Sequence, residues 1–178
     1  MNRLGIVFVS LALTISVTVS QAGEDLVAWP DNYAAYFVRY HSIDKPAGDN
    51  PAKIRFFYVN PESLAHSAAG QPLADGTVLI MEERKVVLDP AGKPVTDRRG
   101  RYVPTDEIIG VLVQQKKTGW GGEYRDDVRN GEWEYAVFNT DGTRKQGVEY
   151  EKCFICHKTK AQADYNFTFS SFLSRMKP

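Results

Sequence analysis

Three residues near the carboxyl end have the types and the spacing for covalent chemistry with haem. Cys153 and Cys156 lie three positions apart, and His157 follows directly. Two thiols at this spacing can add across the two vinyl groups of one haem to form thioethers, and the adjacent histidine then reaches the iron as its proximal ligand. The motif therefore predicts one haem c per chain, attached through both cysteines, with His157 on the iron.

Two other uses of paired cysteines explain this motif less well. A thioredoxin-like redox pair does not need the histidine that follows, and a zinc site would lack a fourth ligand at the usual spacing. The chain contains only these two cysteines. A single covalent haem would therefore use both of them.

The amino end has the features of a secretory signal peptide. One positive charge, at Arg3, precedes an apolar run over residues 4–19, and Ser-Gln-Ala at 20–22 has the small-x-small pattern of a signal peptidase site. We expect cleavage after Ala22, which would leave a mature domain of residues 23–178 in the periplasm. The alternative is an uncleaved anchor, because the apolar run nearly reaches the roughly 17 to 25 residues that span a bilayer.

Composition restricts the class of protein and its partners. The chain carries 22 basic and 22 acidic residues, and it is 43% hydrophobic and 25% charged. This balance is typical of one packed domain. Because no basic block is available to neutralise phosphates, we expect no binding of nucleic acid.

The elements that must position the haem motif are mostly strands separated by turns. Aromatic and β-branched residues predict strands over residues 54–59, 77–81, 108–113 and 133–138, and a continuation of the second strand through Val87 is left open. Residues 89–101 contain two prolines and two glycines and predict an exposed loop. The haem motif is thus expected at the end of a strand-rich chain.

Two short helices are also expected. Asp31 can cap a helix whose aromatic face has helical spacing; this face would consist of Tyr33, Tyr36, Phe37 and Tyr40. His41 would end that helix. A second helix is expected to begin at residues 60–63, to end at Gly70, and to carry His66 on a polar surface. Both histidines are therefore weak candidates for iron ligands.

Several short stretches, in order around the haem motif, resemble the cytochrome P-460 family, which includes the cytochromes c-prime-beta. The stretches are Tyr58-Val59-Asn60-Pro61-Glu62-Ser63, Ala65-His66, Asp75-Gly76-Thr77-Val78, Asn130-Gly131-Glu132-Trp133 and, after the motif, Lys158, Ala161, Asp164 and Phe167-Thr168. The resemblance spans roughly residues 29–173. It implies a single α+β domain, with a mainly antiparallel β-sheet and flanking short helices around one c-type haem, and a homodimer.

The resemblance also implies an iron whose distal side is open or weakly capped. Family members bind small molecules such as nitric oxide, or oxidise hydroxylamine. The enzymatic members carry a lysine cross-linked to the porphyrin, and in this sequence that position falls on Met81, which has no amine. A distal acidic residue of those members falls on Leu112, which cannot accept a proton.

Further candidates for the haem environment are an arginine and several phenylalanines. Arg55 falls where the family has an arginine; it is expected either to pair with a haem propionate or a bound ligand, or to be a solvated residue on a polar strand face. The phenylalanines are expected chiefly in the core, with one or two capping the distal face; they are Phe56, Phe57, Phe167, Phe169 and Phe172.

Two functions follow as hypotheses. The first is an exported monohaem cytochrome that binds a small ligand such as nitric oxide, or exchanges electrons with a partner cytochrome. The second is an oxidoreductase that oxidises hydroxylamine or a related nitrogen compound. Met81 in place of lysine favours the first, and whether catalysis occurs is left open. Met81 itself is expected either to ligate the iron or to act as an apolar lid.

Overall fold

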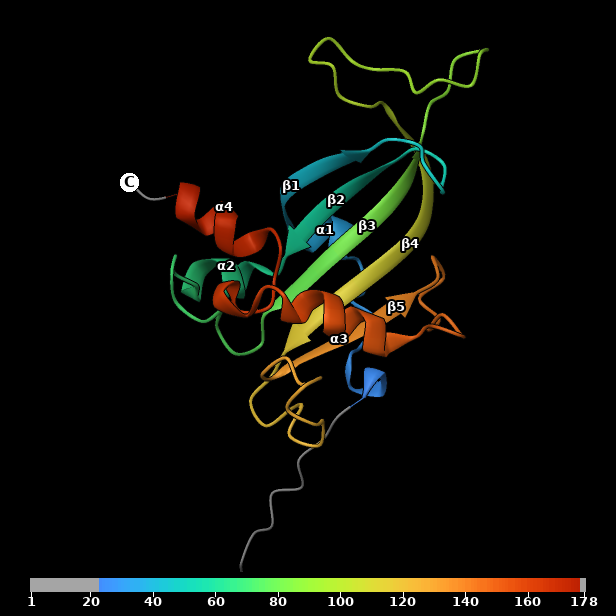
Figure 1. Ribbon diagram of the computed structural model, residues 1–178. Coiled ribbons are helices and arrows are strands. Elements are labelled where there is room, and N and C mark those ends of the chain that lie inside the picture. The colour runs from blue at the N-terminus through green and yellow to red at the C-terminus, as the bar shows by residue number, and fades with distance from the viewer. Residues whose placement is uncertain (1–22, 177–178) are drawn as a thin grey trace, which may run out of the picture.

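The computed structural model describes residues 23–176, so the predicted signal peptide lies outside the described residues. Five strands form one antiparallel sheet in which spatial order follows chain order (Figure 1). The strands are β1 (Val38–Lys45), β2 (Lys53–Val59), β3 (Val78–Val86), β4 (Pro104–Lys116) and β5 (Trp133–Phe138). The α+β fold expected from the sequence, a single domain with a mainly antiparallel sheet, is confirmed.

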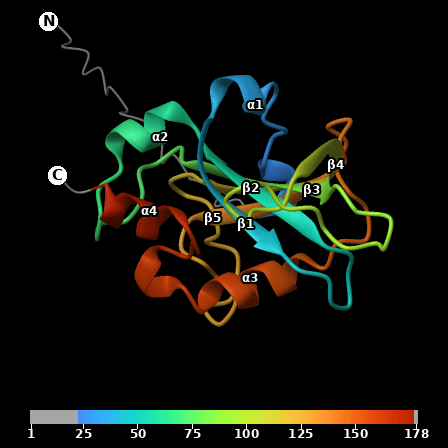
Figure 2. The same ribbon diagram turned by 90° about the horizontal axis from the view of Figure 1, so that it is seen from above.

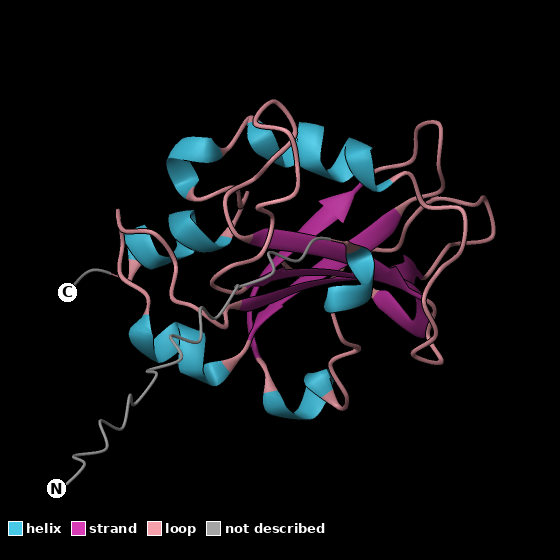
Figure 3. Ribbon diagram, turned by 90° about the horizontal axis from the view of Figure 1, so that it is seen from below, coloured by secondary structure: helices cyan, strands magenta, loops and turns pink. Residues whose placement is uncertain are grey.

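Short helices lie on both sides of the sheet (Figure 3). They are η1 (Glu24–Leu26), α1 (Tyr33–Tyr36), α2 (Pro61–His66), α3 (Tyr150–Lys158), η2 (Ala161–Ala163) and α4 (Phe169–Arg175). Seen from above, α3 and α4 lie on the opposite side of the sheet from α1 (Figure 2). No helix among residues 23–176 is long and apolar enough to span a membrane.

Each face of the sheet has its own hydrophobic core, because successive side chains of a strand point to opposite faces. The first face packs against the amino-terminal segment, and its core includes Val27, Tyr33, Phe56, Tyr58, Ile80, Val113 and Phe138. The second face packs against α3 and α4, and its core includes Val59, Leu79, Trp133, Tyr135, Phe154, Phe169 and Leu173. We refer to this second side as the α3 face. The haem motif therefore packs on a different side of the sheet from the amino-terminal segment.

The predicted aromatic helix is largely wrong. Only residues Tyr33–Tyr36 are helical, and the chain enters β1 at Val38, so that Tyr40 and His41 lie on a strand. Strand β1 pairs with β2 along its length, with an irregularity at Tyr40, and this tertiary contact overrides the helical spacing. The residue before the helix is Asn32 in the left-handed conformation, and Asp31 makes no cap.

The other predicted elements hold with changed boundaries. The strand at 133–138 is confirmed, and the strands near 54–59, 77–81 and 108–113 correspond to β2, β3 and β4. Strand β3 also includes the continuation that the sequence leaves open, as far as Val86. The second helix, α2, ends at His66 rather than at Gly70. Residues 89–101 form the expected loop, which extends away from the sheet between β3 and β4 (Figure 1).

Candidate haem site

Helix α3 brings the three motif residues onto one side of a helix. Cys153, Cys156 and His157 occupy positions i, i+3 and i+4, which are neighbours on a helical surface. The buried Phe154 anchors this helix, because its ring lies 4.6 Å from that of Tyr124 and 4.8 Å from that of Tyr135, centroid to centroid. Cys153 is half-buried and Cys156 is exposed.

The His157 ring is held in the orientation and tautomer of a metal ligand. Its Nδ1 lies 2.7 Å from the backbone oxygen of Tyr165. A carbonyl oxygen can only accept, so Nδ1 carries the proton and Nε2 retains a lone pair. Burial lowers the pKa of His157, against the smaller opposing effect of the Tyr165 hydrogen bond, and this favours the neutral ring that binds metal. Such an imidazole fits a haem iron.

Two aromatic rings fix the plane of the His157 ring. The Tyr135 ring lies 4.8 Å away, and the Phe167 ring meets it edge-on at 5.0 Å, centroid to centroid. Phe167 is nevertheless 45% exposed. The side of α3 that carries His157 therefore offers apolar surface to a further group.

The alternatives to haem find little support around the two thiols. Burial, followed by the charge of Cys156, raises the pKa of Cys153. A redox-active thiol of the thioredoxin kind has a lowered pKa instead. Residues 23–176 contain no group of three or more His, Cys, Asp or Glu side chains that could hold a metal ion.

A row of apolar side chains crosses the sheet on the α3 face. Successive Cα partners in β2, β3, β4 and β5 form this apolar row, which consists of Phe57, Met81, Leu112 and Val137. Tyr135, two residues before Val137, belongs to the core beneath α3, so the row points to the same side. The structure thus brings the two sequence-predicted distal positions, Met81 and Leu112, side by side.

Arg55 lies one row further along the α3 face, where it pairs with an acid that the sequence did not single out. Its guanidinium is 2.7 Å from one carboxylate oxygen of Glu83, and Lys53 Nζ is 2.7 Å from the other. Burial alone would raise the pKa of Glu83, but the hydrogen bonds from Lys53 and Arg55 outweigh it and lower that pKa. Arg55 is therefore a half-buried ion-pair partner rather than a solvated residue.

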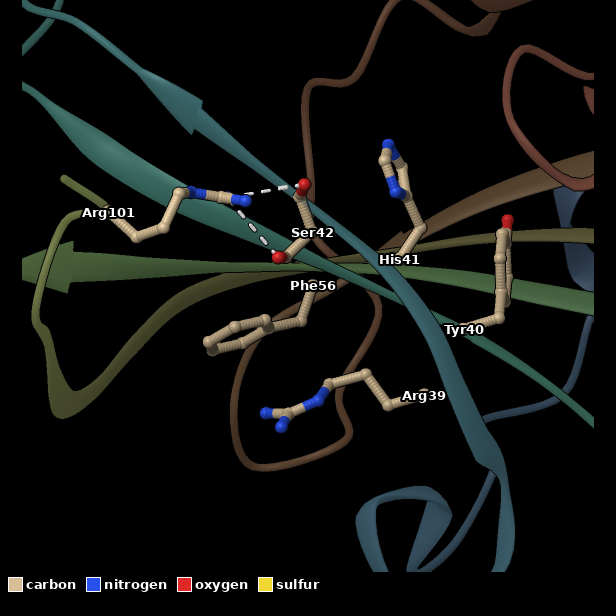
Figure 4. A pocket seen from close by; sticks show the side chains of 6 residues that line it. All are labelled: Arg39, Tyr40, His41, Ser42, Phe56 and Arg101. Carbon is tan, nitrogen blue, oxygen red and sulfur yellow. Dashed lines mark hydrogen bonds between the residues drawn. The ribbon is translucent and has the colours of Figure 1, made fainter. Parts of the chain in front are cut away.

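The two other histidines lie on elements other than α3, and the ring of one of them, His41, lies 5.7 Å from that of Phe57 in the apolar row, centroid to centroid. His66 is exposed on α2, with Nδ1 2.7 Å from the backbone oxygen of Glu62. His41 lies on β1 at a groove of about 350 Å³, where it and Tyr40 point to one side of the strand and Arg39 and Phe56 to the other (Figure 4). The groove is lined by Arg39, Tyr40, His41, Ser42, Phe56 and Arg101.

The phenylalanines divide between the cores and the candidate site. Phe56 belongs to the first face, whereas Phe169 and Phe172 pack on the Tyr40 ring of the α3 face. Phe57 belongs to the apolar row, where it is the Cα partner of Met81, and Phe167 packs beside His157.

Fold and site together define an α+β protein that carries a haem-attachment motif on a short helix against an antiparallel sheet. A family model described as Cytochrome P460 matches residues 30–168. The chain belongs to the Cytochrome P460 family, and this membership implies a haem cofactor with its iron. No curated protein matches the chain.

Proposed function

We propose that this chain is an exported, monohaem c-type cytochrome that binds a small neutral ligand such as nitric oxide, exchanges electrons with a partner cytochrome, or does both. The observation that carries the proposal is the hydrogen bond from His157 Nδ1 to the Tyr165 carbonyl, which leaves Nε2 free for iron. Cys153 and Cys156, on the same side of α3, would form the thioethers.

The haem supplies a redox-active iron, and the residues of this chain determine what can approach it. The apolar row contains no side chain that accepts a proton, because its members are Phe57, Met81, Leu112 and Val137. Apolar walls disfavour charged ligands, which lose hydration without compensation, but tolerate a neutral diatomic gas. This supports ligand binding or electron transfer over proton-coupled oxidation.

The proposed protein is located in the periplasm and forms a homodimer. The sequence features of residues 1–22 support secretion to the periplasm, and the family resemblance supports a homodimer.

Oxidation of hydroxylamine or a related nitrogen compound is the second candidate. One observation favours it: the Glu83 carboxylate lies on the same face of β3 as Met81, two residues away, and the hydrogen bonds that it accepts keep it ionised. An ionised carboxylate is the type of group that could accept a proton from such a substrate. Both of its oxygens are engaged by Lys53 and Arg55, which limits this role.

The test begins with peptide mass spectrometry of the exported protein. We expect haem only on the peptide that contains Cys153, Cys156 and His157, with no lysine peptide attached. Replacing either cysteine by Ala should leave a single thioether or an apoprotein, and His157→Ala should remove the strong axial ligand. Haem that acidified organic solvent extracts intact would contradict covalent attachment.

Optical spectra then separate the two functions. Ferrous protein that binds carbon monoxide and nitric oxide, without turnover of hydroxylamine, is the expected result. A lysine peptide cross-linked to the porphyrin, or hydroxylamine-dependent reduction of an acceptor, would instead favour the enzyme.

A further inference from the structure

The Tyr165 carbonyl accepts two hydrogen bonds from side chains. One comes from His157 Nδ1 at 2.7 Å and the other from Gln114 Nε2 at 2.9 Å. The Gln114 side chain is buried on the α3 face of β4, and its Nε2 also lies 3.4 Å from the Tyr135 hydroxyl. Because a carbonyl cannot donate, the amide must present its nitrogen to Tyr165.

The position of this carbonyl is fixed by contacts other than Gln114. Asp164 and Tyr165 both have positive φ, 50° and 58°, which non-glycine residues adopt only when the surroundings impose it. The Asp164 carboxylate accepts hydrogen bonds from Lys116 Nζ at 2.9 Å and from the Leu73 backbone N–H at 2.8 Å. It also accepts one from Trp133 Nε1 at 3.3 Å. These anchors hold the carbonyl in place when the donor on Gln114 is changed.

Two donors that share one carbonyl oxygen weaken each other, because each withdraws the electron density that the other uses. A strong acceptor at Nδ1–H raises the basicity of the opposite nitrogen and stabilises ferric iron, and hydrogen bonds to the ring of an axial histidine tune haem potentials in this way. The amide of Gln114 therefore reduces the electron donation that the Tyr165 carbonyl can induce in His157.

We propose that Gln114 is a positioning residue that raises the reduction potential of the haem, by competing with His157 for the Tyr165 carbonyl. The proposal rests on the proposed function, in which His157 ligates the iron. Gln114 lies in the row next to the apolar row on the α3 face, because its Cα partner in β3 is Leu79 and not Met81. Its effect on His157 is therefore transmitted chiefly through the shorter hydrogen bond, to the Tyr165 carbonyl oxygen, rather than through the 3.4 Å contact with the Tyr135 hydroxyl.

The test compares Gln114→Leu with Gln115→Leu in the haem-loaded protein. Gln115 is the matched control, since it is the neighbouring residue of β4 and points to the opposite face of the sheet. In Gln114→Leu we expect a more negative reduction potential and a higher iron–histidine stretching frequency in the resonance Raman spectrum of the ferrous protein. Gln115→Leu should leave both values unchanged.

The other outcomes overturn the proposal. An unchanged potential and frequency in Gln114→Leu would show that the amide does not compete for the carbonyl. A lower frequency with a more positive potential would show that Gln114 merely holds the carbonyl in place. If Gln114→Leu does not fold, Gln114→Met supplies the same test with a side chain of nearly the original length. Absence of an iron–histidine band in the unaltered protein would defeat the proposed ligation itself, and is thereby distinguished from failure of the Gln114 proposal.

Discussion

Met81 is the residue that we expect at the position of the cross-linked lysine of the enzymatic family members. Its Cα partners are Phe57 on one side and Leu112 on the other, so its thioether is flanked by apolar groups on the α3 face. A strand residue held in a continuous ladder cannot adjust its backbone as the methionine of a loop can. This favours an apolar lid over an iron ligand.

Replacing Met81 by Ala should accelerate carbon monoxide binding to the ferrous protein and leave the ferric spin state unchanged, because the lid is removed and no ligand is lost. Stopped-flow or flash-photolysis rates and the ferric spectrum measure this. Met176→Ala is the control, since Met176 is exposed just beyond α4. Loss of a weak far-red charge-transfer band in Met81→Ala would show instead that the sulfur ligates iron. Unchanged rates and spectrum would show that Met81 does not face the haem.

At the scale of elements, the segment after α3 is held by a largely buried ion pair that joins it to three other parts of the chain. Lys116 of β4 contacts Asp164, and it also donates to the backbone oxygen of Leu73 at 3.0 Å. Trp133 of β5 donates to the same Asp164 carboxylate. The pair therefore ties the loop before β3 and the two last strands to the segment that presents the Tyr165 carbonyl.

Asp164→Ala should destabilise the protein by about 3 kcal/mol, because it leaves the Lys116 ammonium buried without its counter-charge. Thermal or denaturant unfolding of the haem-loaded protein measures the loss. Asp127→Ala, which removes an exposed partner of Arg125, is the control and should change the stability little, because water screens an exposed ion pair. The double variant Lys116→Met/Asp164→Asn should recover much of the stability, because asparagine tolerates the positive φ and keeps an oxygen for the Leu73 N–H. Equal losses of stability in Asp164→Ala and Asp127→Ala would show that the Lys116–Asp164 pair stabilises the fold no more than an exposed ion pair does.

Two asparagines from the stretches that resemble the family, Asn60 and Asn130, connect neighbouring elements of the fold through hydrogen bonds. The Asn60 side chain accepts from the Val78 backbone N–H at 2.9 Å and donates to the Gly76 oxygen at 3.3 Å, which ties α2 to the start of β3. Asn130 donates to the Phe154 oxygen at 3.0 Å and so ties the loop before β5 to α3. These two asparagines therefore hold the elements around the candidate haem site in place and do not themselves belong to the site.

The sequence predicts the features that depend on neighbouring residues, and it misses those that depend on contacts between residues far apart in the chain. The cysteine motif and the strand at 133–138 are local patterns, and local patterns suffice to place them on α3 and β5. Gln114 and Glu83 were missed because their roles depend on strand register, and the Gln114 contact spans 51 residues. The partner of His157 is a backbone oxygen, which has no side-chain signal. The prediction of the aromatic helix was wrong because the pairing of β1 with β2 outweighed the helical spacing of its aromatic residues.

At the scale of the whole molecule, the amino-terminal segment is docked on the face of the sheet opposite α3. Val27 is fully buried, and Arg144 donates to the backbone oxygens of Glu24 and Val27. The docking brings the Gly23 N–H to the carboxyl group of Glu134, which also accepts from the Tyr124 hydroxyl at 3.0 Å. The other oxygen of this fully buried carboxyl group, Oε1, has no hydrogen-bond partner among residues 23–176.

Glu134 should make the stability of the unprocessed chain depend on pH. Burial raises the pKa of Glu134 from 4.5 to about 7, although the hydrogen bonds from Tyr124 and Gly23 act in the opposite direction. Below pH 4.5 both the folded and the unfolded chain keep the proton, so there is no penalty. Between pH 4.5 and 7 only the unfolded chain releases it, so the free energy of unfolding falls as the pH rises, by up to about 3 kcal/mol in total.

Unfolding measured from pH 4 to 8 on a chain that retains Ala22 should show this fall, and Glu134→Gln should remove it. Glu151→Gln, on the exposed surface of α3, is the matched control and should leave the slope as it was. A chain that begins at Gly23 should show a smaller fall, because its α-ammonium group replaces the Gly23 amide beside Glu134 and favours the ionised carboxylate. The same slope in all four proteins would show that Glu134 does not titrate in this range. The same slope in the two chains with native Glu134, lost only in Glu134→Gln, would show that the amino group of Gly23 does not reach the carboxylate.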